Sequence, residues 1–237
     1  MSLQTRKITY DFMGAYKPPA VASRQGIWCS KITAAAGSPT IQTGSSGAME
    51  LTLEATSEVQ NLCLYFGDVL PFDIDDIIRV SFLAKLSGTL AAAVTGAFGL
   101  ANARNDALAS ITVASLFRFA GGTANSLVLD ARDGTNSQSG IATGEVPGTA
   151  WRRYVMDFQT NVKTMSPPSL SKGGKADIGY FVSDTNGVLK RMARNTNFDM
   201  SAHTTGLQPF VQLQKTAGTA TGTLYVAEVE VEYKLPI

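Results

Sequence analysis

The most specific chemical pattern in this sequence is a run of three glutamates. Glu228, Glu230 and Glu232 alternate with apolar residues. In a β-strand, residues two positions apart share a face and their backbones stand about 6.6 Å apart. Glycoside hydrolysis uses two carboxyl groups roughly 5–9.5 Å apart, so this spacing permits it. It equally permits a solvated strand face, opposite a core face formed by Tyr225, Ala227, Val229, Val231 and Tyr233.

The run also resembles the Glu-x-Asp-x-Glu strand of sandwich-fold retaining glycosidases. That resemblance implies a catalytic role for the three glutamates. The chain departs from the pattern at its centre, where Glu230 stands in place of aspartate. We therefore favour the solvated strand face and keep glycoside hydrolysis as an alternative.

A second candidate is the aromatic and basic stretch that begins at Trp151. Alternation over 151–158 predicts a strand with Trp151, Arg153 and Asp157 on one face. A tryptophan beside an arginine can stack on a sugar ring or anchor a protein interface. It is also a common half-buried packing residue. The stretch is thus a candidate for contact with a glycan or a protein.

Basic residues are concentrated in residues 151–194. This window holds eight basic and three acidic residues, a net charge of +5, whereas the rest of the chain carries −4. Such asymmetry suits an acidic partner, including a second copy of the chain, although a solvated hairpin and loop would give the same count. We predict a homo-oligomer. The interface candidates are Trp151, Arg153, Lys163, Lys172, Lys175 and Arg191.

Few residues are available for metal or cofactor chemistry. One histidine, His203, and two cysteines, Cys29 and Cys63, make a transition-metal site improbable, and both cysteines should be buried free thiols. The aspartates of 73–76 and 130–133 lack the spacing of a calcium loop and should form turns and caps. No phosphate-binding, dinucleotide-binding or nucleophile-elbow motif occurs, so we expect no cofactor.

Charge and hydropathy also restrict the partners. A net charge of +1 with 16% charged residues argues against binding of nucleic acid. The sequence has no run of 18 apolar residues and no signal-peptide pattern, which predicts neither a membrane-spanning segment nor export. Proteins and glycans remain as partners.

Strand-like segments follow one another along the whole sequence. Period-two alternation is clearest in 6–12, 49–55 and 78–86, and further strand segments recur between turn residues, whereas helical periodicity is nearly absent. Asp184–Gly187 contains Asn-Gly, which predicts a hairpin with a type I′ turn. The pattern predicts a single all-β domain over 1–237, a two-sheet antiparallel β-sandwich with few short helical turns.

Two segments are expected to be long loops, 134–149 and 159–176. The candidates for short helical structure are 101–109 and the turn at 73–76. The first strand is expected to pair near the last, because chain termini often lie close together.

Several strand segments, 71–82, 115–119 and 151–158, are separated by loops of Ala, Gly, Ser and Thr. In this the chain resembles structural proteins of tailed-bacteriophage virions, with their jelly-roll or concanavalin-like sandwiches. The resemblance implies a non-enzymatic capsid, decoration or tail-associated part, assembled in the bacterial cytoplasm through contacts with itself or other virion proteins. It carries over no functional residue. The alternatives are a carbohydrate-binding module that uses Trp151 and a glycosidase that uses Glu228, Glu230 and Glu232.

Overall fold

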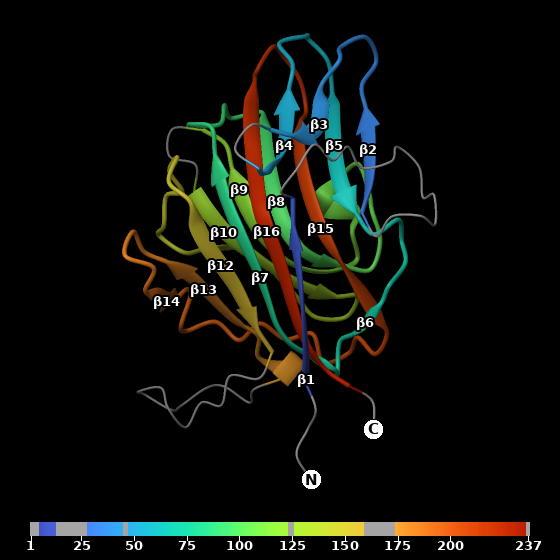
Figure 1. Ribbon diagram of the computed structural model, residues 1–237, viewed down its shortest axis with the longest axis vertical. Helices are drawn as coiled ribbons and strands as arrows, with labels where there is room; N and C mark the ends of the chain where they lie inside the picture. The colour runs from blue at the N-terminus through green and yellow to red at the C-terminus, as the bar shows by residue number, and fades with distance from the viewer. Residues whose placement is uncertain (1–4, 13–27, 45–46, 123–125, 159–173, 236–237) are drawn as a thin grey trace.

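A computed structural model describes residues 5–12, 28–44, 47–122, 126–158 and 174–235. Two antiparallel sheets are stacked face to face in this part of the chain (Figure 1). Its helical elements are two single-turn 3-10 helices, η1 (Leu108–Ser110) and η3 (Gly174–Ala176). No helix there is long and apolar enough to cross a bilayer. The prediction of an all-β, two-sheet sandwich is confirmed.

The first sheet, sheet A, contains β1 (Thr5–Asp11), β3 (Thr40–Thr43), β4 (Met49–Leu53), β7 (Ile77–Leu86), β12 (Arg152–Asp157), β13 (Gly179–Ser183), β14 (Leu189–Arg191) and β16 (Gly222–Lys234). Its strand order is β14-β13-β12-β7-β16-β4-β3, and β1 pairs with the later part of β16. The first strand therefore lies beside the last, as the sequence predicts.

The second sheet, sheet B, contains β2 (Cys29–Thr33), β5 (Gln60–Tyr65), β6 (Phe72–Asp73), β8 (Val94–Ala101), β9 (Val113–Ala120), β10 (Ser126–Asp133), β11 (Ser137–Ala142) and β15 (Gly206–Lys215). Its order is β11-β10-β9-β8-β15-β5-β2, with β6 paired to β15. Each sheet gives one face to the core between them. β4 of sheet A alternates between buried and half-buried residues, whereas β5, β8 and β15 of sheet B are buried on both faces.

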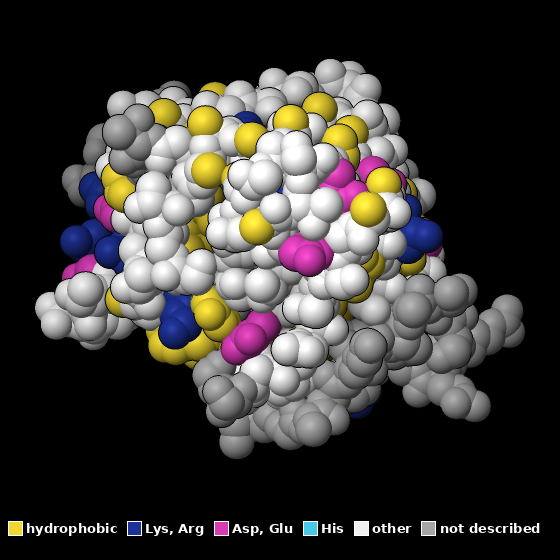
Figure 2. Space-filling view, turned by 90° about the horizontal axis from the view of Figure 1, so that it is seen from above, with side chains coloured by type: hydrophobic (Ala, Val, Ile, Leu, Met, Phe, Trp, Pro, Cys, Tyr) yellow, Lys and Arg dark blue, Asp and Glu magenta, His cyan; other side chains and the backbone are white. Residues whose placement is uncertain are grey.

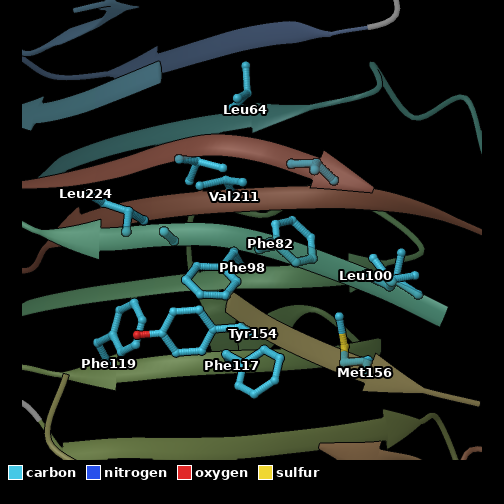
Figure 3. Close-up of a cluster of buried hydrophobic side chains, with 14 of the residues drawn as sticks. Leu64, Phe82, Phe98, Leu100, Phe117, Phe119, Tyr154, Met156, Val211 and Leu224 are labelled. Atoms are coloured by element: carbon cyan, nitrogen blue, oxygen red, sulfur yellow. The ribbon is translucent and has the colours of Figure 1, made fainter. Parts of the chain in front are cut away.

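Aromatic side chains fill the space between the sheets (Figure 3). Phe98 of sheet B lies 5.1 Å from Phe82 and 5.0 Å from Tyr154 of sheet A, measured between ring centroids. Phe117 stands edge-on to Tyr154 at 5.3 Å. Such pairs contribute about 0.5–1.5 kcal/mol beyond their buried area. Burial among these rings raises the pKa of Tyr154.

A bulge in β16 corrects the face predicted for this strand. Val226 pairs with Ala84 and Glu228 with Leu83, so Ala227 is an extra residue. The bulge reverses the alternation on its N-terminal side. Val229 and Val231 face the core as predicted, but Tyr225 and Ala227 do not, and Leu224 and Val226 take the core positions.

The Asn-Gly hairpin is present with a different turn. Gly187 has a φ of 81°, whereas Asn186 is not among the described residues with positive φ, so a type I′ turn is ruled out. The Gly187 amide donates to the Asp184 carbonyl at 3.1 Å, and the Asp184 amide donates to the Val188 carbonyl at 2.9 Å. This is a three-residue loop with its glycine in the left-handed conformation.

The loops and short strands also differ from the sequence-based expectations. Residues 134–149 contain the edge strand β11, and β3 was not predicted. The predicted strand segment 71–82 is interrupted by a turn, with β6 before it and β7 after it. Of the segment 101–109, Ala101 ends β8, residues 102–107 form an irregular connection, and a single helical turn follows at Leu108–Ser110. The predicted loop 159–176 lies outside the described residues except at 174–176, where η3 forms.

Candidate functional site

The outer face of sheet B is partly covered by the connection between β8 and β9. Leu108 and Ile111 of this connection lie on outward-facing apolar residues of β5, β8, β9 and β15, among them Cys63, Ala97, Ala114, Leu116 and Phe210. They form a second, smaller hydrophobic cluster. Cys63 is a free thiol there, as predicted, and burial raises its pKa. It is therefore a packing residue and not a nucleophile.

Polar groups fix the position of this connection. The Asp68 carboxylate accepts hydrogen bonds from the Arg104 amide at 3.1 Å and from Gln208 Nε2 at 2.8 Å. The Asp106 carbonyl accepts one from Gln212 Nε2 at 3.0 Å. Because the connection is held at several points, it can serve as a rigid wall.

Beside this wall the outer face is hollowed. The hollow has a volume of about 250 Å³. Five strands and η1 contribute its lining, which is Thr95, Leu108, Ala109, Arg118, Asp130, Arg132, Ser139 and Gln214. Pockets for drug-sized ligands span roughly 300–1,000 Å³, so this one suits a smaller group.

A bulge on β11 builds the floor of the hollow. Leu129 pairs with Ile141 and Ala131 with Gln138, so two residues, Ser139 and Gly140, stand opposite Asp130. Gly140 has a φ of 70°, a conformation that favours glycine. Its amide donates to Asp130 Oδ1 at 2.6 Å, and Ser139 Oγ donates to the same atom at 3.0 Å.

Arg118 completes the environment of Asp130. Its Nε donates to Oδ2 at 2.8 Å and its Nη2 to Oδ1 at 3.2 Å, a bidentate pair. The Asp130 side chain is 3% exposed and that of Arg118 is 24% exposed. Burial raises the pKa of Asp130, but the hydrogen bonds from Arg118, Gly140 and Ser139 outweigh it, and the pKa lies below its usual value. The aspartate is therefore ionised at neutral pH.

Arg132 is the second guanidinium of the hollow. Its Nη1 donates to the Ala109 carbonyl at 3.2 Å and its Nη2 to the Leu108 carbonyl at 3.1 Å. Its Nε is buried without a hydrogen-bond partner among the described residues. Arg132 thus connects η1 to β10 through neutral acceptors.

The three glutamates lie elsewhere, on the outer face of sheet A. Glu228 Oε1 is 2.7 Å from Arg153 Nη1, and Glu230 Oε2 is 2.7 Å from Lys7 Nζ. Glu232 is paired with Lys7 in the strand register. None of them lines the hollow on sheet B or a smaller one of about 130 Å³ beside Asp184. This arrangement is a ladder of opposite charges across neighbouring strands.

Trp151 contacts residues of the same outer face. Its ring stands edge-on to Tyr225, with the centroids 6.4 Å apart. Lys85 Nζ lies 4.8 Å from the Trp151 centroid and 4.9 Å from that of Tyr225. The cation lies over a ring face that a sugar would need for stacking. Trp151 thus packs against Tyr225 and Lys85, and its contact with a glycan or a protein stays a prediction.

Five of the eight basic residues of 151–194 have acidic partners among the described residues. Arg152 pairs with Glu145 at 3.2 Å and Lys175 with Asp75 at 2.8 Å. Figure 2 shows Lys and Arg side chains interspersed with Asp and Glu on one end of the molecule.

The interface candidate Arg191 also has an acidic partner, whereas two of the lysines are not placed. Arg191 pairs at 3.5 Å with Asp177, which is 2% exposed. Lys163 and Lys172 lie outside the described residues. Because part of the positive charge is neutralised internally, the charge argument for self-association is weakened, and oligomerisation stays a prediction.

The aspartates considered for calcium have other roles. Asp130, which was expected in a turn or cap, instead lies within β10 and pairs with Arg118. Asp73 Oδ1 accepts the Asp75 amide at 2.9 Å, and Asp133 Oδ1 accepts the Thr135 amide at 2.9 Å, both typical of turns. The described residues contain no group of three or more His, Cys, Asp or Glu that could hold a metal ion.

The backbone is similar to those of several solved structures. Peanut lectin aligns with a TM-score of 0.57 at 10% identity over 99% of this chain and 100% of its own. A β-glucanase from Bacillus licheniformis aligns with 0.55 at 14% identity, covering 92% and 97%. The carbohydrate recognition domain of Emp47p aligns with 0.53 at 12% identity, covering 92% and 93%.

At these identities the likeness shows the fold, a concanavalin-like sandwich as the sequence predicts, and not the activity. No protein-family model matches the sequence, and no curated protein matches it.

Sequence patterns did not identify the residues of the hollow as a candidate site. Arg118 occurs between two core phenylalanines, and Asp130 and Arg132 flank an inward-facing alanine. The available signal was a charged residue within an otherwise apolar strand. Sequence spacing could not show that β9 and β10 place these charges beside Ser139.

Proposed function

We propose that this protein is a non-catalytic glycan-binding module whose binding site is the hollow on the outer face of sheet B. The observation that carries the proposal is the bidentate pair of Arg118 and Asp130 at the floor of that hollow. Its groups are held in place before any ligand arrives. Such preorganisation lowers the entropic cost of binding.

The chemistry of the lining fits sugar hydroxyls. A hydroxyl both donates and accepts hydrogen bonds, so it can use the guanidinium of Arg118 as donor and Oδ2 of Asp130 as acceptor. Thr95, Ser139 and Gln214 add neutral groups of both kinds. Leu108 supports contact with the apolar side of a ring. The shared fold with lectins and a carbohydrate recognition domain is consistent with this proposal.

The hollow favours binding over hydrolysis. Asp130 is the one carboxylate among its described lining residues, whereas glycosidases use two. A general acid also needs a raised pKa, and the pKa of Asp130 is lowered. Its Oδ1 already accepts three hydrogen bonds. It is therefore suited to orient a ligand and not to transfer a proton.

A glycan panel tests the proposal. Thr95 lines the hollow, and Thr95→Tyr should fill it, whereas Thr40→Tyr adds the same bulk to an exposed position on sheet A. We expect the parent and Thr40→Tyr to bind the same glycans and Thr95→Tyr to lose them, with both variants folded by circular dichroism. Equal binding by all three proteins, or no glycan bound by the parent, would reject the site.

We retain the virion role as a second proposal, supported by the sequence resemblance alone. A virion protein also acts through contacts, so this role is compatible with glycan binding and would place the module in a virion. Light scattering checks the predicted self-assembly: a mass above 25.1 kDa supports it. A monodisperse monomer at about 0.1 M salt argues against it.

A further inference from the structure

The charges around the hollow do not balance. Arg118 is neutralised by Asp130 at 2.8 Å. Arg132 lines the same hollow and has no carboxylate within ion-pair distance among the described residues. The lining therefore carries two guanidinium groups and one carboxylate, a net charge of +1.

The environment of Arg132 points to a missing anion. Two of its nitrogens donate to main-chain carbonyls, which satisfy hydrogen bonds but do not neutralise charge. Its Nε is buried and unpartnered. Arg132 is half-buried, and a charged group partly removed from water is costly unless it is paired. A neutral sugar in the hollow would displace water and leave this charge uncompensated.

A ligand with its own negative charge removes that cost. The guanidinium group is planar and presents its donors in a fork that matches a carboxylate. The carbonyls of Leu108 and Ala109 hold the fork in one orientation, so little side-chain entropy is lost when an anion arrives. The position of Arg132 beside the Arg118–Asp130 pair places the anion site next to groups suited to hydroxyls.

We propose that the hollow selects an acidic saccharide, one whose ring carries a carboxylate, with Arg132 as its counter-ion. This inference rests on the proposed glycan-binding function and names its ligand class. Arg118 and Asp130 would contact hydroxyls of the same ring. The size of the hollow, about 250 Å³, matches recognition of a small part of a longer glycan.

Matched pairs of ligands test this inference. Oligomers of glucuronic, galacturonic and mannuronic acid are titrated calorimetrically, each beside its methyl ester, which keeps the ring and removes the charge. We expect the parent to bind at least one free acid about tenfold more tightly than its ester. The free energy of a hydrogen bond to a charged group corresponds to a difference in Kd of roughly that size. The preference should weaken as salt is raised.

Variants assign the preference to Arg132. Arg132→Gln should bind acid and ester alike, and Arg132→Lys should retain part of the preference. The control Arg79→Gln also removes one positive charge, but on sheet A, and it should leave the preference for the acid intact. Because Arg132 anchors η1, thermal melting of each variant checks that the fold persists.

The possible failures are distinguishable. Equal affinity for acid and ester, or binding of neutral glycans only, overturns the acidic specificity while the glycan-binding function stands. A tenfold preference for sulfated oligosaccharides over uronates overturns the choice of a carboxylate. Binding of no saccharide of any kind overturns the proposed function itself.

Discussion

Arg118 and Asp130 form a bidentate ion pair across two neighbouring strands, with Nε–Oδ2 and Nη2–Oδ1 distances of 2.8 and 3.2 Å. Leu116, not Arg118, is the direct partner of Asp130 in the strand register, so the pair is diagonal. The diagonal geometry turns the guanidinium along the sheet. It lets one arginine form part of the hollow and also neutralise the aspartate beneath it.

Removing the charge of Asp130 should destabilise the protein. Asp130→Asn leaves Arg118 partly buried without its counter-charge, and we expect a loss of about 2 kcal/mol, below the range for fully buried pairs because Arg118 is 24% exposed. Urea unfolding measures it. The control Asp75→Asn changes a carboxylate that is 60% exposed and pairs with Lys175, and it should cost no more than about 0.5 kcal/mol. Similar losses in both variants would contradict the importance of the pair.

The conformation of Gly140 gives a separate prediction. A Cβ there would meet only Arg118 Nη2, at an ordinary 3.6 Å, so the cost of Gly140→Ala comes from its φ of 70°. We expect a loss of about 1–2 kcal/mol. In Gly148→Ala, the added Cβ meets nothing within 4 Å and no positive φ is required. If the two glycine variants had equal unfolding free energies, the bulge would not depend on glycine.

Glu58 should make stability depend on pH. Its carboxylate accepts hydrogen bonds from Gln60 and from the amides of Ala35, Ala36 and Gly37, which lower its pKa from 4.5 to about 2. A carboxyl group whose folded pKa is depressed stabilises the fold above its unfolded pKa, and the effect is lost as pH falls through the folded value.

The melting temperature of Glu58→Gln should therefore lie below that of the parent at pH 7. The gap should narrow between about pH 4.5 and pH 2, where the parent's carboxylate becomes protonated. Thermal melting at a series of pH values measures it. A gap that stays constant over this range would show that Glu58 does not titrate with folding.

The glutamate ladder should be dispensable for any activity. Glu230 pairs with Lys7, whose side chain is 57% exposed, so Glu230→Gln should change the unfolding free energy by no more than about 0.5 kcal/mol. A polysaccharide hydrolysis screen provides the functional check. Turnover by the parent that disappears in Glu230→Gln would establish the glycosidase alternative.

Sequence alternation predicted the long strands well, and physical reasons explain where it failed. β7 places Val80, Phe82 and Ala84 in the core, as its period-two pattern requires. β11 is an edge strand whose residues are mostly exposed, so no hydrophobic face marks it. The bulge at Ala227 depends on pairing with β7 and has no local signature.

The candidate site was beyond the reach of sequence reasoning for a different reason. Its polar residues come from β8, β9, β10, β11 and β15, and only the order of strands in sheet B brings them together. The glutamates and Trp151 stood out because their pattern is local. Other strands supply the residues that contact them. Arg153 and Lys7 pair with the glutamates, and Lys85 lies over Trp151.

Chemical-shift mapping tests the glycan-binding hollow most directly. The isotope-labelled protein is titrated with the tightest-binding glycan of the panel, and its backbone amide shifts are followed. We predict that the largest changes occur at Arg118, Ser139 and Gly140, around the hollow on sheet B. Largest changes at Trp151 and Tyr225, or along Glu228, Glu230 and Glu232, would place binding on sheet A and contradict the account.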